Sequence, residues 1–314
     1  MDNTRPSIAI IGSGAVGSYY GGRLAEAGNN VRFLMRRDYH VVRKNGLKVT
    51  SPDGNFTLTK PTVFSSSNEI GLVDWVICAL KAISIEDARK LVQPCVAADT
   101  RIIVLMNGLG LEERFANWFG AKRIFGGLAF TCINRGDPGY VHHIAHGTVT
   151  FGHFQNDPVE LEKVVALWAQ SKVQVSVTPS LLCARWEKLC WNIPFNGLAV
   201  AAGGITTDRI TGNPDLRNAA RSLMEEVIMT GNTDLAAHHE KIRLNRVEII
   251  ERLFRLTETM GAYKASTMID FMEGRMMEIE AMFGEPLRRS EILGISTPQL
   301  ALLTALLRTL NEQR

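Results

Sequence analysis

A glycine-rich segment near the N-terminus constrains the fold more than any other feature of the chain. Gly12-Ser13-Gly14-Ala15-Val16-Gly17 has the pattern GxGxxG, directly follows the apolar run 8–11, and opens a helical pattern over 15–27. The first glycine permits a tight turn, the second lets a pyrophosphate approach the backbone, and the third lets helix and strand pack closely. The helix N-terminus also favours phosphate. Residues 12–17 therefore predict dinucleotide binding, with a glycine-rich turn that holds no ligand as the alternative.

The end of the next strand indicates which dinucleotide binds. A strand is predicted over 31–35, and Arg36-Arg37 follows it where an NAD site usually has Asp or Glu for the ribose 2′-hydroxyl. A guanidinium suits a 2′-phosphate, so the sequence favours NADP, with Arg36 the first candidate and Arg37 the second. The alternative is a solvated basic pair on a loop.

The remaining strand and helix patterns place an α/β domain before an all-α domain. Apolar runs at 75–80 and 102–106, with a helical pattern at 86–96 between them, indicate a parallel sheet with helices on both faces. Further strands are predicted at 125–130, 140–144, 148–151 and 173–177, with a turn at 136–139 and a helix at 158–170. Beyond Thr178-Pro179-Ser180 only helical patterns remain, at 216–239, 242–260 and 297–310. We predict a Rossmann-type domain with a mainly parallel sheet over 1–179 and a helical substrate domain over 180–314.

Composition and charge exclude several classes of partner. The 314 residues carry 35 Lys+Arg against 32 Asp+Glu, a net charge of +3 that gives no reason to expect nucleic acid or an acidic membrane surface. The longest uncharged stretch, 189–207, contains proline, glycine and asparagine and is not predicted to span a membrane. No signal-peptide pattern is present at the N-terminus, and the five cysteines have no CxxC spacing. We expect a cytoplasmic protein with reduced, mostly buried thiols.

Four histidines between 142 and 153 raise the question of a metal site. His142 and His143 are neighbours on a predicted strand, so they face opposite ways, and no acidic or cysteine partner has ligand spacing. No metal is therefore predicted.

Two polar residues directly follow buried strands, where ligands of open α/β sheets bind. Lys81 follows the run 75–80 and could contact cofactor or substrate oxygens. Asn107 follows the run 102–106 and could orient the nicotinamide ribose or the substrate. The alternatives are a snorkelling surface lysine and an ordinary Asn-Gly turn.

The second domain carries a polar stripe within an apolar segment. Lys188, Asn192 and Asn196 recur at i, i+4 and i+8, which places them along one face of a helix. Pro194 is predicted to kink or break that helix. A later segment, 264–280, brings Ser266, Asp270 and Glu278 near helical spacing, and a carboxylate there could meet Lys188. Polar groups satisfied by the protein or water, and a solvated helix face, are the alternatives.

These residues together resemble the ketopantoate reductase (2-dehydropantoate 2-reductase) family over nearly the whole chain. The resemblance rests on the following features: the loop at 12–17, Arg36, Lys81 in Leu-Lys-Ala, Asn107-Gly108, the pattern WxKLxxNxxxN at 186–196, Ser266 with Asp270, Gly274-Arg275, and Glu278. The pattern at 186–196 is the specific one, since general Rossmann dehydrogenases lack it.

The resemblance implies roles for individual residues. Lys188 is implied to be the catalytic lysine and Glu278 the catalytic-site carboxylate. The keto acid is implied to be bound by Asn107, Asn192, Asn196 and Ser266, with the active site in the interdomain cleft. Two positions depart from the family: Gly197 stands where proline is common, and Ile205-Thr206-Thr207 where some members have a substrate-binding Asn.

The function expected from these features is NADPH-dependent reduction of 2-dehydropantoate to pantoate, a step of pantothenate biosynthesis. A reductase of the same architecture that acts on another 2-keto acid is the first alternative, and a non-catalytic NADPH-sensing protein is the second. The intact Lys188 pattern argues against the sensor. The sequence leaves the oligomeric state open, with a homodimer as one option.

Overall fold

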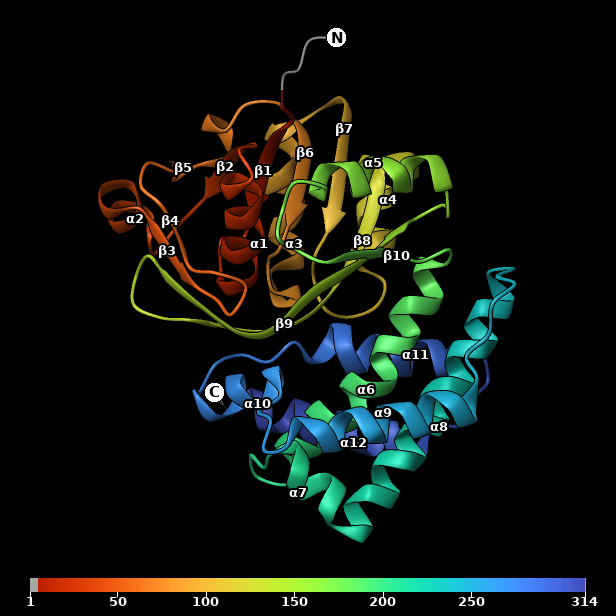
Figure 1. The fold of residues 1–314 in the computed structure, drawn as a ribbon. Coiled ribbons are helices and arrows are strands. Elements are labelled where there is room, and N and C mark those ends of the chain that lie inside the picture. Colours follow the sequence, from red (N-terminus) through yellow and green to blue (C-terminus); the bar gives the residue numbers. More distant parts are fainter. Residues whose placement is uncertain (1–4, 314) are drawn as a thin grey trace. The chain divides into compact units, whose positions relative to one another are not determined.

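The computed structural model describes residues 5–313 and divides them into two compact units (Figure 1). The first unit comprises the described residues up to Met106 together with Leu111–Leu181. The second comprises Asn107–Gly110 together with the described residues from Leu182 onward. The short segment 107–110 therefore belongs with residues that lie far from it in the sequence. The domain limits at residues 179 and 180 stay a prediction.

A single ten-stranded sheet forms the first unit, in the order β4-β3-β9-β8-β7-β6-β1-β2-β5 with β10 paired to β9. All neighbouring pairs are parallel except β3 with β4 and β8 with β9, so the predicted mainly parallel sheet is confirmed. The strands are β1 (Ser7–Ile11), β2 (Asn30–Leu34), β3 (Leu47–Thr50), β4 (Phe56–Leu58), β5 (Thr62–Phe64), β6 (Val73–Cys78), β7 (Val96–Val104), β8 (Ile124–Arg135), β9 (Tyr140–His153) and β10 (Val175–Val177).

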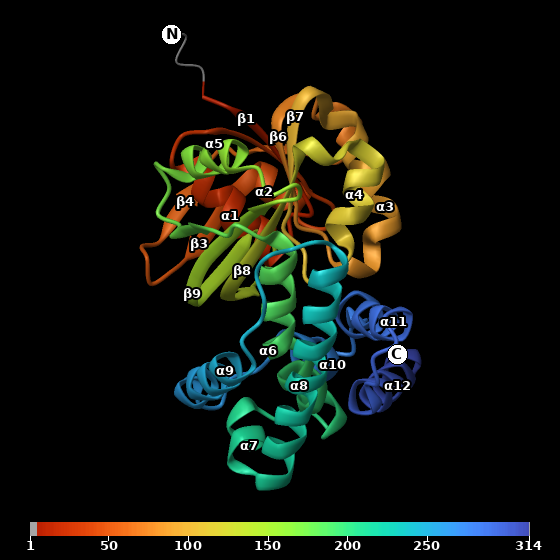
Figure 2. The same cartoon turned by 90° about the vertical axis from the view of Figure 1, so that its right-hand side faces the viewer.

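Helices cover both faces of this sheet, because its central strands are apolar on both sides. Ile8 and Ile10 of β1 pack in the same core cluster as Tyr20 of α1 and Trp168, and Ile11 is equally buried. Figure 2 shows α1 and α5 on one face and α3 and α4 on the other. The helices of this unit are α1 (Ala15–Glu26), α2 (Tyr39–Asn45), α3 (Ile85–Val92), α4 (Leu111–Phe119) and α5 (Pro158–Trp168).

The strands predicted at 140–144 and 148–151 form one continuous strand, β9. It pairs antiparallel with β8 from Phe125↔His153 to Arg135↔Val141, with register shifts near the middle. His146 (φ 66°) and Gly147 (φ 108°) adopt left-handed backbone conformations at this place. Such an irregularity absorbs extra residues without ending the strand, which is why the polar interruption in the sequence is not a strand boundary.

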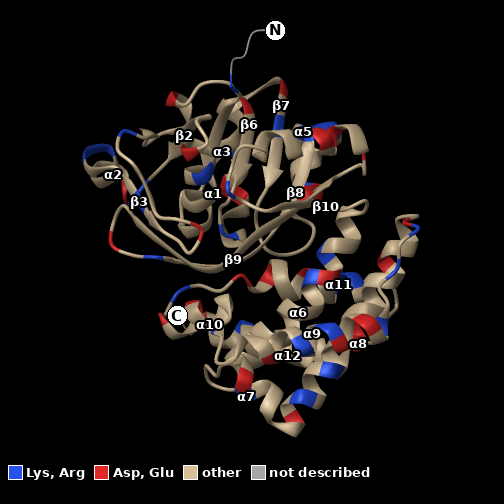
Figure 3. Cartoon of the chain, viewed as in Figure 1, with Lys and Arg blue, Asp and Glu red and all other residues tan. Residues whose placement is uncertain are grey.

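The second unit is all-helical, as predicted. Its elements after Leu181 are α6 (Leu181–Ala201), α7 (Thr207–Gly212), α8 (Pro214–Ala237), α9 (Arg246–Met260), α10 (Ser266–Met272), the π-helix η5 (Glu280–Gly284), α11 (Glu285–Ile292) and α12 (Pro298–Glu312). Basic and acidic segments mix along α8, α9 and α11 (Figure 3), and pairs such as Arg217–Glu258 at 2.6 Å neutralise each other locally. Within residues 5–313, no helix combines the length and apolarity needed to cross a membrane.

Helices α9 and α6 differ from the sequence prediction. Helix α9 begins at Arg246 and not near 242, because the Asn245 side chain caps it by accepting the Glu248 N–H at 3.2 Å. Helix α6 continues through Pro194, so of the predicted kink or break, the break does not occur. Ile193 and Phe195 on either side of the proline are fully buried, so tertiary packing outweighs the one backbone hydrogen bond that proline removes.

Gly197 of α6 packs closely against α12 and η5. A Cβ at Gly197 would lie 2.5 Å from Leu303 Cδ2 and 2.9 Å from Phe283 Cε1. Both neighbours are buried side chains with little room to move. The glycine that departs from the family pattern at this position is therefore explained by its contact with α12 and η5.

We expect Gly197→Ala to lower the free energy of unfolding by about 1–3 kcal/mol, because overpacking exceeds the gain in helix propensity. Gly212→Ala is the matched control, since a Cβ at this helical glycine meets nothing within 4 Å. The control should leave stability unchanged or raise it by up to about 1 kcal/mol. Thermal and urea denaturation followed by circular dichroism would test this, and equal stabilisation by both alanines would contradict it.

Candidate functional site

The glycine loop has the geometry that its sequence pattern predicts. Gly12 has φ +99°, and a Cβ there would lie 2.6 Å from the Leu80 amide nitrogen at the end of the neighbouring strand region. A Cβ at Gly17 would collide with the Gly12 carbonyl oxygen. Only glycine at these two positions allows the turn after β1 and the close packing of α1 beside it.

The N-terminus of α1 is open toward a ligand. Gly14 is its N-cap, no side chain caps it, and space beyond the Gly14 Cα is empty within 4 Å. The backbone N–H groups of Ala15 and Val16 in the first turn therefore suit an anion. The Ser13 hydroxyl is buried and has no hydrogen-bond partner in the described part of the chain. An uncapped helix end, an open glycine and an unsatisfied hydroxyl together fit a pyrophosphate.

The two arginines after β2 have different surroundings. Arg37 Nε lies 3.5 Å from the Asp38 carboxylate, which also receives Arg135 Nη2 at 2.6 Å. Arg36 is exposed and forms no ion pair within residues 5–313. The Asp38 carboxylate therefore engages Arg37 and leaves Arg36 as the more available guanidinium.

Lys81 follows the end of β6, which lies beside the glycine loop. It follows β6 by two residues, Ala79 and Leu80, and the Leu80 amide is the group that approaches Gly12. The Lys81 side chain is exposed. The fold thus brings the backbone before Lys81 to the loop, and the role of its ammonium stays a prediction.

Asn107 meets Lys188 although 81 residues separate them. Lys188 Nζ donates a hydrogen bond to Asn107 Oδ1 at 2.9 Å, and both residues belong to the second unit. The sequence proposed both residues for the site and did not predict this contact. An amide oxygen that accepts from the ammonium restricts where the Lys188 side chain can point.

The polar residues of α6 lie along one face because the helix is continuous. Lys188, Asn192 and Asn196 span eight residues, or about 12 Å along the axis. Asn192 and Asn196 are 8% and 1% exposed, so the stripe faces inward beyond the lysine. Its first member contacts Asn107 and its last contacts the start of α10.

Asn196 caps a helix, a role that its spacing alone did not reveal. Its Oδ1 accepts the Thr267 N–H at 3.0 Å and the Ser266 hydroxyl at 3.4 Å. The N-cap of α10 is Ala265, which has no side-chain oxygen for this purpose. The absence of Ser, Thr, Asp or Asn at the N-cap position is the one sequence signal that another part of the chain caps α10. The structure therefore brings Asn196 and Ser266 together, as substrate binding by both would require.

Glu278 is 9% exposed and directly precedes the helical turn that leads into η5. Its carbonyl accepts the Met282 N–H at 3.3 Å. π-Helical segments occur frequently at functional sites, which agrees with a site carboxylate here. The direct pairing of Glu278 with Lys188 stays a prediction, as does the cleft between the domains.

The histidines of β9 have structural partners. His143 is 3% exposed; its Nδ1 pairs with Ser51 Oγ at 2.8 Å, and burial lowers its pKa below the usual value. His153 Nε2 contacts the Lys122 carbonyl at 3.1 Å. Within residues 5–313, no group of three or more His, Cys, Asp or Glu side chains could hold a metal ion.

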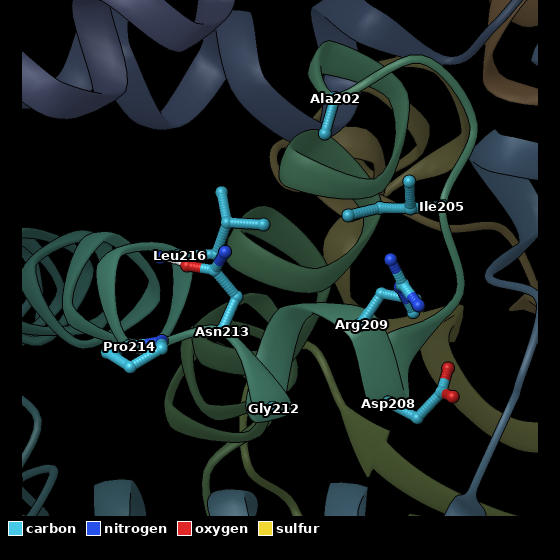
Figure 4. Close-up of a pocket in the computed structure, with 8 residues that line it drawn as sticks. All are labelled: Ala202, Ile205, Asp208, Arg209, Gly212, Asn213, Pro214 and Leu216. Atoms are coloured by element: carbon cyan, nitrogen blue, oxygen red, sulfur yellow. Dashed lines mark hydrogen bonds between the residues drawn. The ribbon is translucent and has the colours of Figure 1, made fainter.

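A cavity of about 550 Å³ lies elsewhere in the second unit (Figure 4). Its lining comes from the segment that follows α6, from α7 and from the start of α8. None of the residues predicted from the sequence lines it. The lining residues are Ala202, Ile205, Asp208, Arg209, Gly212, Asn213, Pro214 and Leu216.

Comparison with known proteins gives the same family along both units. The family described as Ketopantoate reductase PanE/ApbA matches residues 8–156, and its C-terminal family matches residues 180–311. A 2-dehydropantoate 2-reductase of Nostoc sp. (strain PCC 7120) is 34% identical over 298 residues, which cover 93% of this chain and 91% of the relative.

Solved structures agree. The 2-dehydropantoate 2-reductase of Geobacter metallireducens GS-15 is 40% identical with a TM-score of 0.92, and the match covers 96% of this chain and 99% of that one. The Methylococcus capsulatus 2-dehydropantoate 2-reductase is 29% identical with a TM-score of 0.87, covering 98% and 97%. A D-mandelate dehydrogenase complex with NADH, 22% identical with a TM-score of 0.88 and covering 98% and 99%, shares the fold.

The two family matches together span most of the chain. Relatives above 30% identity match it over nearly its whole length. This chain belongs to the ketopantoate reductase family, a family of pyridine-nucleotide-dependent reductases.

Proposed function

We propose that this protein catalyses the NADPH-dependent reduction of 2-dehydropantoate to pantoate. The observation that carries the proposal is the hydrogen bond from Lys188 Nζ to Asn107 Oδ1, because it holds an ammonium at the head of a stripe of buried amides. The family match and the relatives named 2-dehydropantoate 2-reductase support this substrate. The reaction belongs to pantothenate biosynthesis, and a cytoplasmic location remains the expectation.

The residues for NADP are those of the first unit, with Asn107 in addition. The N–H groups at the start of α1, the open Gly14 and the Ser13 hydroxyl would hold the pyrophosphate. Arg36 would pair with the 2′-phosphate, since Asp38 already engages Arg37. Lys81 would contact phosphate or substrate oxygens.

The chemistry divides between cofactor and chain. The bound cofactor supplies the hydride that the keto carbon receives. Lys188 stabilises the negative charge that grows on the keto oxygen and donates the proton that completes the hydroxyl. Asn107 restricts the position of the ammonium by accepting one of its N–H bonds.

The substrate's remaining polar groups need partners along α6. Asn192, one turn after Lys188, is placed to bind the carboxylate or hydroxyl, and Asn196 with Ser266 forms the far end. Glu278 would bind the substrate hydroxyl and orient Lys188. A homodimer stays one option for the assembly; one structural neighbour, from Staphylococcus aureus, is itself a dimeric ketopantoate reductase.

One assay separates this proposal from the two alternatives. NADPH consumption would be followed with 2-dehydropantoate and a panel of other 2-keto acids. Preference for 2-dehydropantoate supports the proposal, preference for another keto acid supports a reductase of the same architecture, and NADPH binding without turnover supports a sensor.

We expect Arg36→Ala to weaken NADPH binding by about 1–3 kcal/mol, the scale of a lost charge-assisted hydrogen bond, and to leave NADH binding nearly unchanged. Arg37→Ala is the matched control and should affect NADPH much less, because Asp38 holds that side chain. Fluorescence titration of both cofactors would measure this. Equal losses for NADPH and NADH in the Arg36 variant would refute the 2′-phosphate role.

Asn196→Ala should raise the KM for keto acid and also reduce stability by about 1 kcal/mol, since α10 loses its cap. Asn196→Asp keeps an oxygen acceptor for Thr267 and removes the amide donor. It should therefore keep near-native thermal stability while KM rises and NADPH affinity stays unchanged. A native KM in the Asp variant would show that Asn196 is a helix cap with no role in substrate binding.

Lys188→Ala should reduce kcat by about 10²-fold or more, because its benefit is greatest in the transition state. Lys188→Gln retains an N–H donor for Asn107 but no ammonium, so it should lose comparable activity with the local structure preserved. NADPH binding, measured by fluorescence, should survive both changes. A soluble, NADPH-binding variant of either kind with near wild-type turnover would end the proposal.

A further inference from the structure

The segment that carries Asn107 is anchored on the π-helix η5 through a backbone hydrogen bond. The Leu109 N–H donates to the Ala281 carbonyl at 2.9 Å, across 172 positions of sequence. Leu109 is 3% exposed and packs in the core cluster of the second unit. The residue two positions before it, Asn107, is the acceptor for Lys188. The position of the acceptor therefore depends on this anchor.

The Ala281 carbonyl is open to Leu109 because of two local features of the helix. In a π-helix a carbonyl accepts from the residue five positions later, and the Glu285 N–H accordingly donates to the Glu280 carbonyl. The next donor in this register would be residue 286. That residue is proline, which has no N–H. The Ala281 carbonyl thus lacks its helical donor, and the Leu109 amide takes the place.

Glycine at 108 is required for the approach. Gly108 has φ +116°, and a Cβ there would lie 2.5 Å from Ala281 Cβ and 2.7 Å from the Ala281 carbonyl oxygen. Gly110 is also close to the helix, because a Cβ there would lie 3.2 Å from Glu285 Oε1. The Asn107-Gly108 pair therefore serves contact with η5 and is not only a turn signal.

We propose that Pro286 is a positioning residue for the reaction, acting through the Ala281 carbonyl and Leu109 to seat Asn107 against Lys188. The inference rests on the proposed function for its effect on catalysis. The anchoring itself is a property of the fold. Restoring an N–H at 286 supplies a competitor for the Ala281 carbonyl and releases the segment.

The main variant is Pro286→Ala, with Pro298→Ala as its control. Both remove a proline near a helix start, but Pro298 opens α12 after the N-cap Thr297, where a restored N–H has no helical acceptor. In Pro286→Ala we expect kcat to fall roughly tenfold or more, since small displacements of a positioned group can cost up to about 10²-fold. The control should keep wild-type kcat.

A second pair of variants tests the other side of the contact. Gly108→Ala introduces the clash with Ala281, and Gly120→Ala is the control because Gly120 has a similar φ of +95° with nothing within 4 Å of a Cβ. Both changes place alanine at a positive φ, where its side chain strains the backbone. Only the first should reduce kcat, with thermal stabilities of the two variants measured in parallel to separate seating from general destabilisation.

Hydrogen exchange of the Leu109 amide gives a readout that does not depend on activity. Its exchange should accelerate by roughly tenfold or more in Pro286→Ala and in Gly108→Ala, and in neither control. Wild-type Leu109 protection in Pro286→Ala, or a kcat loss matched by the controls, would overturn the proposal. If wild-type protein does not reduce 2-dehydropantoate, the proposed function fails, and the exchange data still decide whether Pro286 anchors the segment.

Discussion

The hydrogen bond between Lys188 and Asn107 is the interaction on which the candidate site depends. It joins the first turns of α6 to a four-residue segment that the chain contributes from between β7 and α4. An ammonium on a flexible four-carbon stem loses side-chain entropy when it is fixed, so its partner must itself be held. The Leu109–Ala281 bond and the close contact of Gly108 provide that support.

Helix α6 must satisfy two demands with one sequence. Its apolar residues, such as Trp186, Ile193 and Phe195, form much of the core of the second unit, while Lys188, Asn192 and Asn196 keep one stripe polar. Buried amides are stable only with partners, and Asn196 finds them at the start of α10. The same residue therefore caps α10 and contacts Ser266, so a substitution there removes both contacts.

The nucleotide loop depends on backbone geometry more than on side chains. Gly12 and Gly17 are required by close contacts, and Gly14 leaves space where a ligand would lie. The proposed selectivity for NADP depends on the side chains after β2. The Asp38 carboxylate, which also pairs with Arg135 from 97 positions later in the chain, lies next to Arg37 and so distinguishes it from Arg36.

The sequence by itself determined the Rossmann-type sheet, the helical second domain and the α6 stripe, because these follow from local periodicity and from glycines at fixed spacing. The tertiary structure decided what long-range packing controls. It kept α6 continuous through Pro194, merged two predicted strands into β9, and paired Asn107 with Lys188. It also gave Asn196 a capping role and left the Ala281 carbonyl to Leu109. The three pairings join residues far apart in the chain, and local patterns carry no record of such partners.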